Sequence, residues 1–184
     1  MNKFLLSSVF ILITISGLLI GCKKNQAIRQ GEVLKVPPPQ KPATETDSIK
    51  VIDNVKFEVT PYFWVNLLPT LPSEKPPFYL SLQIKITNNS TQEITDFSAL
   101  AISLYNAGSS LEFHSFLLVP VEKTQLKEKI PIGETKILNY TNDRTEVFSP
   151  QIDKKMKLYG RVLINLNETQ QVLTTIPTPV EFTY

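Results

Sequence analysis

The stretch "FYLSLQIKIT" (residues 78–87) alternates apolar and polar side chains with a period of two. Its clearest apolar positions are Leu80, Leu82, Ile84 and Ile86. Successive side chains of a strand point to opposite faces, so this pattern predicts an antiparallel strand with one buried and one solvated face. No helical period persists for ten residues after the N-terminal apolar stretch. We therefore expect an all-β domain.

Similar segments recur from Ile49 to the end of the chain. Turn residues separate them, as in Asn88–Thr91 and Asn106–Gly108, and the Asp53–Asn54 pair interrupts the first segment. The expected strands cover 49–59, 78–87, 97–106, 111–119, 135–141, 157–166, 170–176 and 180–184. Seven or eight short strands over this length predict an antiparallel β-sandwich occupying residues 49–184.

Residues 22–48 have a different composition, because apolar side chains are sparse and prolines gather at Pro37, Pro38, Pro39 and Pro42. Such prolines favour an extended polyproline II conformation, and the segment has too little apolar surface to fold by itself. We interpret it as a spacer. A proline-rich ligand for another protein is the alternative.

The first 21 residues are typical of a secretory signal. Lys3 supplies positive charge, and residues 4–20 form an apolar stretch diluted by serine, threonine and glycine. This stretch is short for a membrane span, which needs about 20 predominantly apolar residues. It ends in "LLIGCKK", which contains Cys22, the one cysteine of the chain.

The sequence Leu19-Ile20-Gly21-Cys22 resembles the lipobox of bacterial lipoproteins. The resemblance implies cleavage between Gly21 and Cys22, and a diacylglyceryl group, with further acylation such as palmitate, on Cys22. The alternative is a small buried cysteine beside an uncleaved anchor helix. A single cysteine also excludes an intrachain disulfide.

Lipidation would place the protein on a membrane. Each buried methylene contributes about 0.8 kcal/mol, so two or three acyl chains hold a protein on a bilayer. In the enterobacterial pattern an aspartate after the cysteine retains a lipoprotein in the inner membrane, and this chain has Lys23 there. We therefore expect the protein to be attached to the outer membrane of the cell envelope. The domain could face either the periplasm or the outside of the cell.

A second resemblance covers the folded part. The stretch "LSLQIKITNNSTQEITDFSALAISLYNAG" resembles the central hairpin of bacterial immunoglobulin-like domains of the FxLYD type, related to late-embryogenesis-abundant type 2 domains. Leu104, Tyr105 and Gly108 carry the likeness, as does the later turn in "IPIGETKIL", whereas Asn106 stands where the family has aspartate. The resemblance implies an immunoglobulin-like β-sandwich that binds or scaffolds and does not catalyse.

The segment "PYFWVNLLPTLPSEKPPF" (residues 61–78) contains the only tryptophan among aromatic, leucine and proline residues. The sequence favours packing of this loop over an end of the sandwich. Such residues also provide contact area at low entropic cost, so the loop is the best candidate for a surface that binds a protein or glycan partner. The candidate residues of this loop are Tyr62, Phe63, Trp64, Leu67, Leu68 and Leu71.

The sequence favours no enzyme, metal or cofactor chemistry. His114 is the only histidine, and no GxSxG elbow, phosphate-binding glycine loop or calcium-loop spacing occurs. A net charge of +2 does not indicate a nucleic-acid binder. We expect a membrane-anchored lipoprotein that serves as a binding or envelope-assembly module. The alternative is a small-molecule or lipid carrier with a β-barrel cavity, and the oligomeric state is not indicated.

Overall fold

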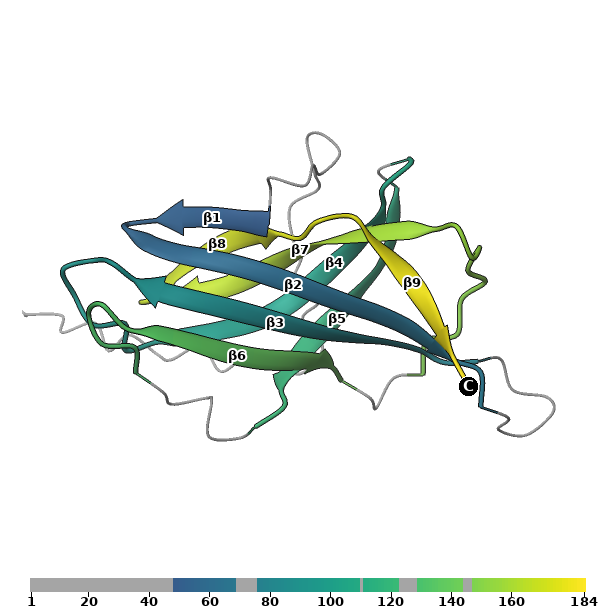
Figure 1. The fold of residues 1–184 in the computed structure, drawn as a ribbon, viewed down its shortest axis with the longest axis horizontal. Coiled ribbons are helices and arrows are strands. Elements are labelled where there is room, and N and C mark those ends of the chain that lie inside the picture. Colours follow the sequence, from purple (N-terminus) through teal and green to yellow (C-terminus); the bar gives the residue numbers. More distant parts are fainter. Residues whose placement is uncertain (1–47, 69–75, 110, 123–128, 144–146) are drawn as a thin grey trace, which may run out of the picture. The chain divides into compact units, whose positions relative to one another are not determined.

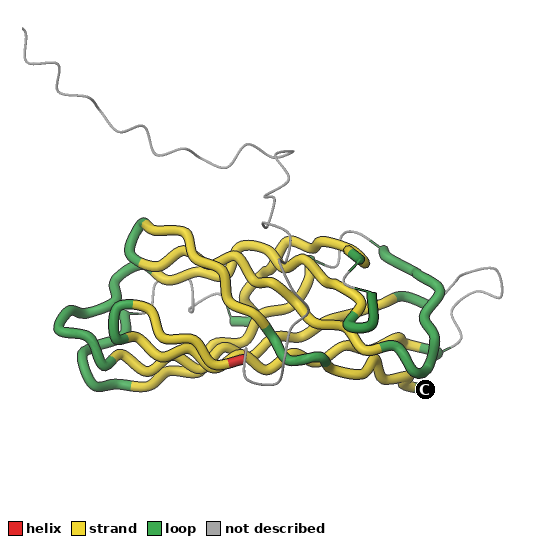
Figure 2. Tube along the Cα trace, turned by 90° about the horizontal axis from the view of Figure 1, so that it is seen from above, coloured by secondary structure: helices red, strands yellow, loops and turns green. Residues whose placement is uncertain are grey.

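The computed structural model describes residues 48–68, 76–109, 111–122, 129–143 and 147–184. All of them belong to one compact unit of the chain, Leu34–Tyr184. These residues form nine strands and no α-helix, with loops gathered at the two ends of the strands (Figures 1 and 2). The expected all-β class is confirmed.

The nine strands are numbered in their order along the chain. They are β1 (Ile49–Ile52), β2 (Val55–Asn66), β3 (Phe78–Asn88), β4 (Phe97–Asn106), β5 (Glu112–Pro120), β6 (Thr135–Asn142), β7 (Lys157–Leu166), β8 (Thr169–Thr174) and β9 (Thr178–Thr183).

Two tight turns have the backbone conformation that two-residue hairpins require. Asp53 and Asn54 have φ angles of 49° and 63°, and Asn167 and Glu168 have φ angles of 45° and 67°. Positive φ at both central residues is the signature of a type I′ turn, whose twist matches that of the flanking strands. The predicted interruption at Asp53–Asn54 is thus a hairpin between β1 and β2, and the predicted turn at Asn167 joins β7 to β8.

Hydrogen bonding connects the strands in the order β1-β2-β3-β6-β5-β4-β7-β8. Strand β9 pairs in parallel with β2 over Val180–Thr183 and antiparallel with β7 at Thr178 and Pro179. Seven strands (β2, β3, β6, β5, β4, β7 and β9) therefore form a closed barrel, and β1 and β8 lie outside this ring (Figure 1).

The strands therefore do not form the two separate sheets of the expected β-sandwich, because they are joined at two corners. Strand β5 pairs with β4 as far as Leu117 and then with β6 from Leu118 onward. Strand β9 makes the other corner, because it changes partner between Pro179 and Val180. Closure of this kind leaves few unpaired edges, which protects a β protein from edge-to-edge association.

The interior is packed with apolar side chains from alternate strand positions. In β3 every second residue is buried, from Phe78 to Ile86. Aromatic rings fill the space between the strands, with centroid separations of 6.0 Å for Phe57–Phe97, 6.3 Å for Phe63–Phe78 and 5.9 Å for Phe78–Phe116. Full burial of such side chains stabilises the fold by about 1.5–3 kcal/mol each.

Buried asparagines connect the loops to the strands. The Asn88 side chain donates to the Gln92 and Ile130 carbonyls at 2.8 and 2.9 Å, so it joins two loops at one end of the barrel. Asn142 ends β6, and its Oδ1 accepts from the Leu80 backbone N–H at 3.1 Å. Since buried amides need partners, these contacts fix where β3 and β6 end.

Candidate functional site

Three of the six candidate residues of the predicted partner-binding loop belong to a strand. Strand β2 extends to Asn66, so Tyr62, Phe63 and Trp64 are strand residues, and this part of the prediction is wrong. Aromatic residues favour strands, and the prolines that suggested a loop are compatible with this one. Pro61 pairs with Leu82 at a point between the ends of β1 and β9, where no described strand pairs with the other side of β2.

The alternation of β2 divides the candidate residues between two environments. Phe63 is fully buried in the core. Tyr62 and Trp64 lie on the outer face, where Tyr62 is 39% exposed. Leu67 and Leu68 follow the end of β2, and Leu68 is 55% exposed. Leu71 lies outside the described residues.

Three aromatic side chains form a continuous row on the outer face, which we call the aromatic row: Tyr62 and Trp64 from β2 and Tyr79 from β3. The ring centroids of Tyr62 and Trp64 are 5.2 Å apart, and those of Trp64 and Tyr79 are 5.5 Å apart. Trp64 and Tyr79 face each other across the strand pair. Cross-strand aromatic contacts of this kind hold the rings in fixed orientations.

A carboxylate borders the aromatic row on the β9 side. The Tyr62 hydroxyl donates to Glu181 Oε2 at 2.8 Å, and Glu181 is paired with Trp64 in the register of β2 and β9. This hydrogen bond to the carboxylate, followed by desolvation, raises the pKa of Tyr62 above its usual value. The phenol therefore remains a neutral donor, and Glu181 stays beside the rings.

Amide and hydroxyl groups continue the same face along β3 and β6. Gln83 Nε2 donates to Asn139 Oδ1 at 3.4 Å, and the Thr141 hydroxyl donates to the Leu80 carbonyl at 2.9 Å. Ser81 lies between Tyr62 and Thr141 in the register. The face thus passes from aromatic to neutral polar side chains.

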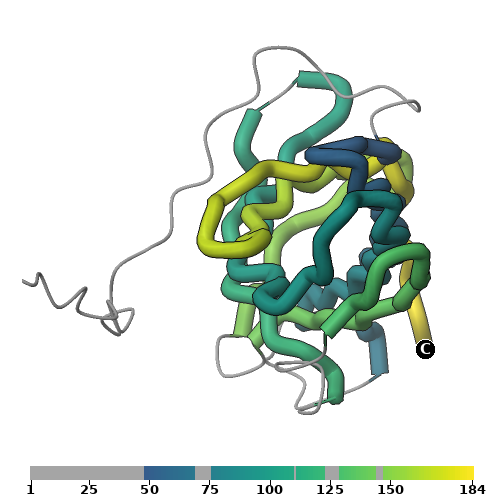
Figure 3. Tube along the Cα trace, turned by 90° about the vertical axis from the view of Figure 1, so that its left-hand side faces the viewer, coloured from purple at the N-terminus to yellow at the C-terminus, as the bar shows by residue number. Residues whose placement is uncertain are grey.

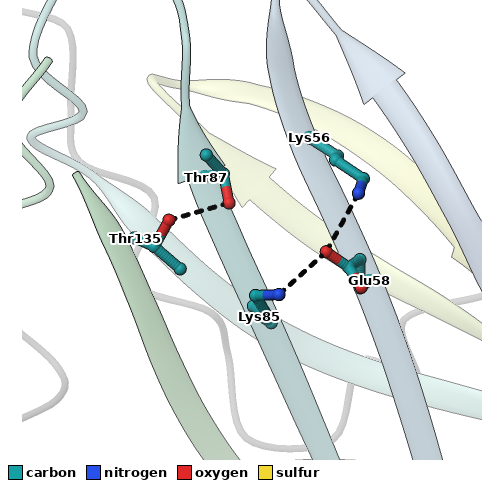
Figure 4. Close-up of polar contacts among 5 residues, drawn as sticks. All are labelled: Lys56, Glu58, Lys85, Thr87 and Thr135. Atoms are coloured by element: carbon teal, nitrogen blue, oxygen red, sulfur yellow. Dashed lines mark hydrogen bonds and ion pairs between the residues drawn. The ribbon is translucent and has the colours of Figure 1, made fainter. Parts of the chain in front are cut away.

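The far end of this face is charged (Figure 4). Glu58 Oε1 lies 3.1 Å from Lys56 Nζ and 3.2 Å from Lys85 Nζ, while Thr87 and Thr135 share a 2.9 Å hydrogen bond between their hydroxyls. The hydrogen bonds from the two lysines hold the pKa of Glu58 below its usual value. Exposed pairs of this kind contribute little to stability, so their main effect is on the charge pattern of the face.

A groove lies beyond the C-terminal end of β2. It has a volume of about 460 Å³, and Val65, Leu67, Ile152 and Phe182 give it apolar walls together with two prolines. Among the candidate residues that the structure describes, only Leu67 lines this groove. Phe63 therefore lies in the core, Tyr62 and Trp64 lie on the outer face, and Leu67 lies at the groove.

His114 is packed within an aromatic cluster. Its ring stacks on Phe148 with a centroid separation of 3.9 Å and meets Phe116 edge-on at 4.5 Å. Phe113 and Phe78 complete the cluster. These contacts give the only histidine a role in packing.

Possible metal ligands are used in turns and strands. Asp153 Oδ1 accepts from the Lys155 N–H at 2.9 Å and so shapes a turn, whereas Asn142 belongs to β6. Within the described ranges, no group of three or more His, Cys, Asp or Glu side chains could hold a metal ion.

The predicted lipobox, with Gly21 and Cys22, lies outside the described residues, as do the predicted signal and most of the spacer. In the part of the chain that the structure describes, no helix is long and apolar enough to cross a membrane. Lipidation of Cys22 stays a prediction.

Comparison with known proteins gives no family match for this chain, and no curated protein matches it.

Two residues of the outer face were missed in the sequence. Tyr79 occupies a polar-face position of the same alternating stretch that predicted β3, so its exposure could have been inferred. Glu181 comes from β9, about 120 residues after Tyr62. Its place beside the aromatic row depends on the parallel β2–β9 pairing, which no local pattern indicates.

Proposed function

We propose that this chain is a membrane-anchored bacterial lipoprotein whose β domain is a non-catalytic binding module of the cell envelope. The anchor rests on the Leu19–Cys22 motif and on the single cysteine. The binding role rests on the aromatic row, which presents preformed rings on an outer face instead of burying them.

The aromatic row fits a glycan best. Pyranose rings have apolar faces that pack on aromatic side chains, and their hydroxyls need donors and acceptors around the contact. The Glu181 carboxylate borders the row on one side. The amides of Gln83 and Asn139 and the hydroxyl of Thr141 lie on the other side. An apolar contact with a few placed polar groups is the usual composition of a small-molecule or sugar site.

We further propose that the closed barrel is a variant of the immunoglobulin-like fold. In that fold one sheet has the order A-B-E-D and the other the order C-F-G. Assigning β2, β3, β6 and β5 to the first sheet and β4, β7 and β8 to the second reproduces both orders. The two corners at β5 and β9 are then additions to this arrangement.

A carrier function has less support. Inward-facing rings such as Phe57, Phe63 and Phe78 pack against one another where a ligand would have to lie. A cavity of about 360 Å³ lies at one end of the strands, lined by the β1–β2 and β7–β8 turns, the strand ends beside them and the loop that follows β3. A buried ligand would need space in the middle of the barrel.

Trp64 offers a direct test, because it is the only tryptophan and lies in the aromatic row. We expect envelope glycans, such as peptidoglycan fragments or cell-surface polysaccharide, to shift its fluorescence. Replacing Tyr79 with Ala should weaken binding about tenfold, which corresponds to about 1.4 kcal/mol. Ile137→Ala, at an exposed position on β6 of the same face, is the matched control.

Absence of any glycan response would count against this partner class. A photo-crosslinker at position 83 in intact cells would then distinguish the remaining possibility. Specific capture of a protein there, lost in Tyr79→Ala, would make the module a protein binder.

Lipidation has its own test. Labelled palmitate should enter the wild-type protein and not Cys22→Ala, and the mature protein should be released from membranes only by detergent. A Cys22→Ala protein that stays membrane-bound as a precursor of unchanged mobility would instead support the anchor-helix interpretation.

A further inference from the structure

The aromatic row lies next to a negative charge with which no described cation pairs. Glu181 is exposed on the outer face, because the residues before and after it in β9 pack against the core. Among the described residues its side chain has one hydrogen-bond partner, the Tyr62 hydroxyl, which donates to Oε2 at 2.8 Å. The ion pairs of the described residues involve Glu58 and Glu93 instead. The second oxygen of Glu181, Oε1, is therefore available to a ligand.

The carboxylate and the rings form one site at the border between β2 and β9. Strand β9 runs beside β2, as the end-on view of Figure 3 shows, and Glu181 pairs with Trp64 in the register. Trp64 pairs in turn with Tyr79 of β3. Neighbouring strands lie about 4.8 Å apart, so a ligand group that packs on the Trp64 ring is within reach of the carboxylate.

The lysines of this face are too distant to offset the charge of Glu181. Lys56 and Lys85 lie beside Glu58, which precedes Trp64 by six residues in β2. At about 3.4 Å per residue this separation is about 20 Å, whereas the Debye length in physiological salt is about 8 Å. The charged cluster at the far end of the face is therefore screened from the aromatic row.

Aromatic rings and a carboxylate are the groups that proteins use to bind an organic ammonium. The π-system of a ring attracts a cation positioned over its face, and a carboxylate accepts charge-assisted hydrogen bonds from ammonium N–H groups. A neutral hydroxyl would form a weaker hydrogen bond with Glu181, and an acidic substituent would be repelled by it. The site thus favours a ligand with a positive charge.

We propose that the aromatic row and Glu181 bind a glycan that carries free amino groups, that is, amino sugars without an acetyl group. A pyranose ring would pack on the row, and its ammonium group would donate to Glu181 Oε1. The Gln83 amide and the Thr141 hydroxyl would meet hydroxyls of the adjoining sugar. This inference rests on the proposed glycan function and adds to it the charge of the ligand.

Attraction of a cationic glycan would be a local effect. The chain has a formal net charge of +2, so the protein as a whole does not attract a polycation. Binding of an amino glycan would depend on the negative charge beside the aromatic row.

Three hexasaccharides with the same cellulose-type backbone test this proposal on the full chain in detergent. The second carbon of each sugar carries a hydroxyl group (glucose), an acetamido group (N-acetylglucosamine) or an amino group (glucosamine), and the emission of Trp64 reports binding. At neutral pH we expect the amino form to bind about fivefold more tightly than the other two, as for one exposed charge-assisted contact.

Glu181→Gln removes the charge but keeps an amide oxygen that can accept from Tyr62, so the rings should hold their positions. The amino and glucose forms should then bind with equal affinity. Glu58→Gln is the matched control, because it makes the same substitution on the same face about 20 Å from Trp64, and it should leave the preference intact. Unaltered emission of both variants without ligand would show that the barrel is intact.

The outcomes distinguish failure of this inference from failure of the proposed function. Equal binding of the three forms to the parent chain would overturn the selectivity for amines and leave the glycan function standing. A preference that survives Glu181→Gln, or that Glu58→Gln also removes, would overturn the role of Glu181. A response only to acetylated or acidic envelope glycans would overturn the inference alone, and no response to any glycan would overturn both.

Discussion

At the scale of single residues, Gly160 shows how tightly side chains fill the core beside β7. A Cβ at this position would lie 2.5 Å from Cδ1 and 2.9 Å from Cγ1 of Ile102, whose side chain is fully buried. Only glycine leaves room for the Ile102 side chain, which reaches over β7 from the neighbouring strand β4.

We predict that Gly160→Ala lowers the free energy of unfolding by about 1–3 kcal/mol, the usual cost of overpacking a core. Urea denaturation followed by circular dichroism would measure the change. Gly108→Ala is the control, because the nearest atom to its new methyl group, Asn106 Oδ1, is 3.4 Å away. Equal effects of the two substitutions would contradict the close approach at Gly160.

Tyr140 gives the stability a dependence on alkaline pH. Burial raises its pKa to about 12, against 10.0 in the unfolded chain, and outweighs a backbone hydrogen bond with Ala99. Because the folded-state pKa is the higher one, the stabilisation is complete below pH 10 and is lost as the pH rises from about 10 to 12.

We expect the wild-type protein to lose about 2–3 kcal/mol through this group between pH 10 and pH 12. Tyr140→Phe cannot ionise, so its stability should fall less over the same interval. Urea titrations at pH 9, 10, 11 and 12 would compare the two. Parallel curves would exclude Tyr140 as a source of the alkaline loss.

At the scale of elements, strands differ in how many neighbours support them. Strand β3 is paired along both sides, with β2 and β6. Among the described strands, β1 is paired only with β2, and its side chains are largely exposed. Local opening is easiest where few buried contacts must break.

Backbone amides of β1 should therefore exchange with deuterium at least about tenfold faster than those of β3. Strand β8, which is also paired on one side only, serves as an internal comparison. Slow exchange in β1 would mean that another segment pairs with its free edge.

The elements were largely predictable, because each depends on local pattern. Alternation located β3, β4 and β7, and the Asp53–Asn54 pair located the first hairpin. The error at Tyr62–Trp64 arose because prolines were given more weight than alternation. In the structure, no described strand needs a backbone N–H from Pro61 on the second side of β2, so the strand continues past the proline.

At the scale of the whole molecule, β9 closes the barrel. Phe63 pairs with Val180 and Val65 with Phe182, so β9 covers an edge of β2 that would otherwise be open. Val180 is 4% exposed, and Phe182 packs against the core.

We predict that removing residues 180–184 destabilises the domain by several kcal/mol, because one full apolar burial alone contributes about 1.5–3 kcal/mol. Removing Tyr184 alone, which is 84% exposed, should change the stability by less than about 0.5 kcal/mol. Thermal unfolding followed by circular dichroism would measure both. Cooperative unfolding of the longer deletion at the wild-type temperature would show that β9 is dispensable.

The sequence by itself determined the strands, the tight turns and the faces of most strands, because side-chain alternation and positive-φ turns are local properties of the chain. Only the tertiary structure decided two further features. These are the closure of the sheets through β5 and β9 and the place of Glu181 beside Tyr62. Both depend on contacts between residues distant in sequence, whose formation reflects the packing of the whole domain.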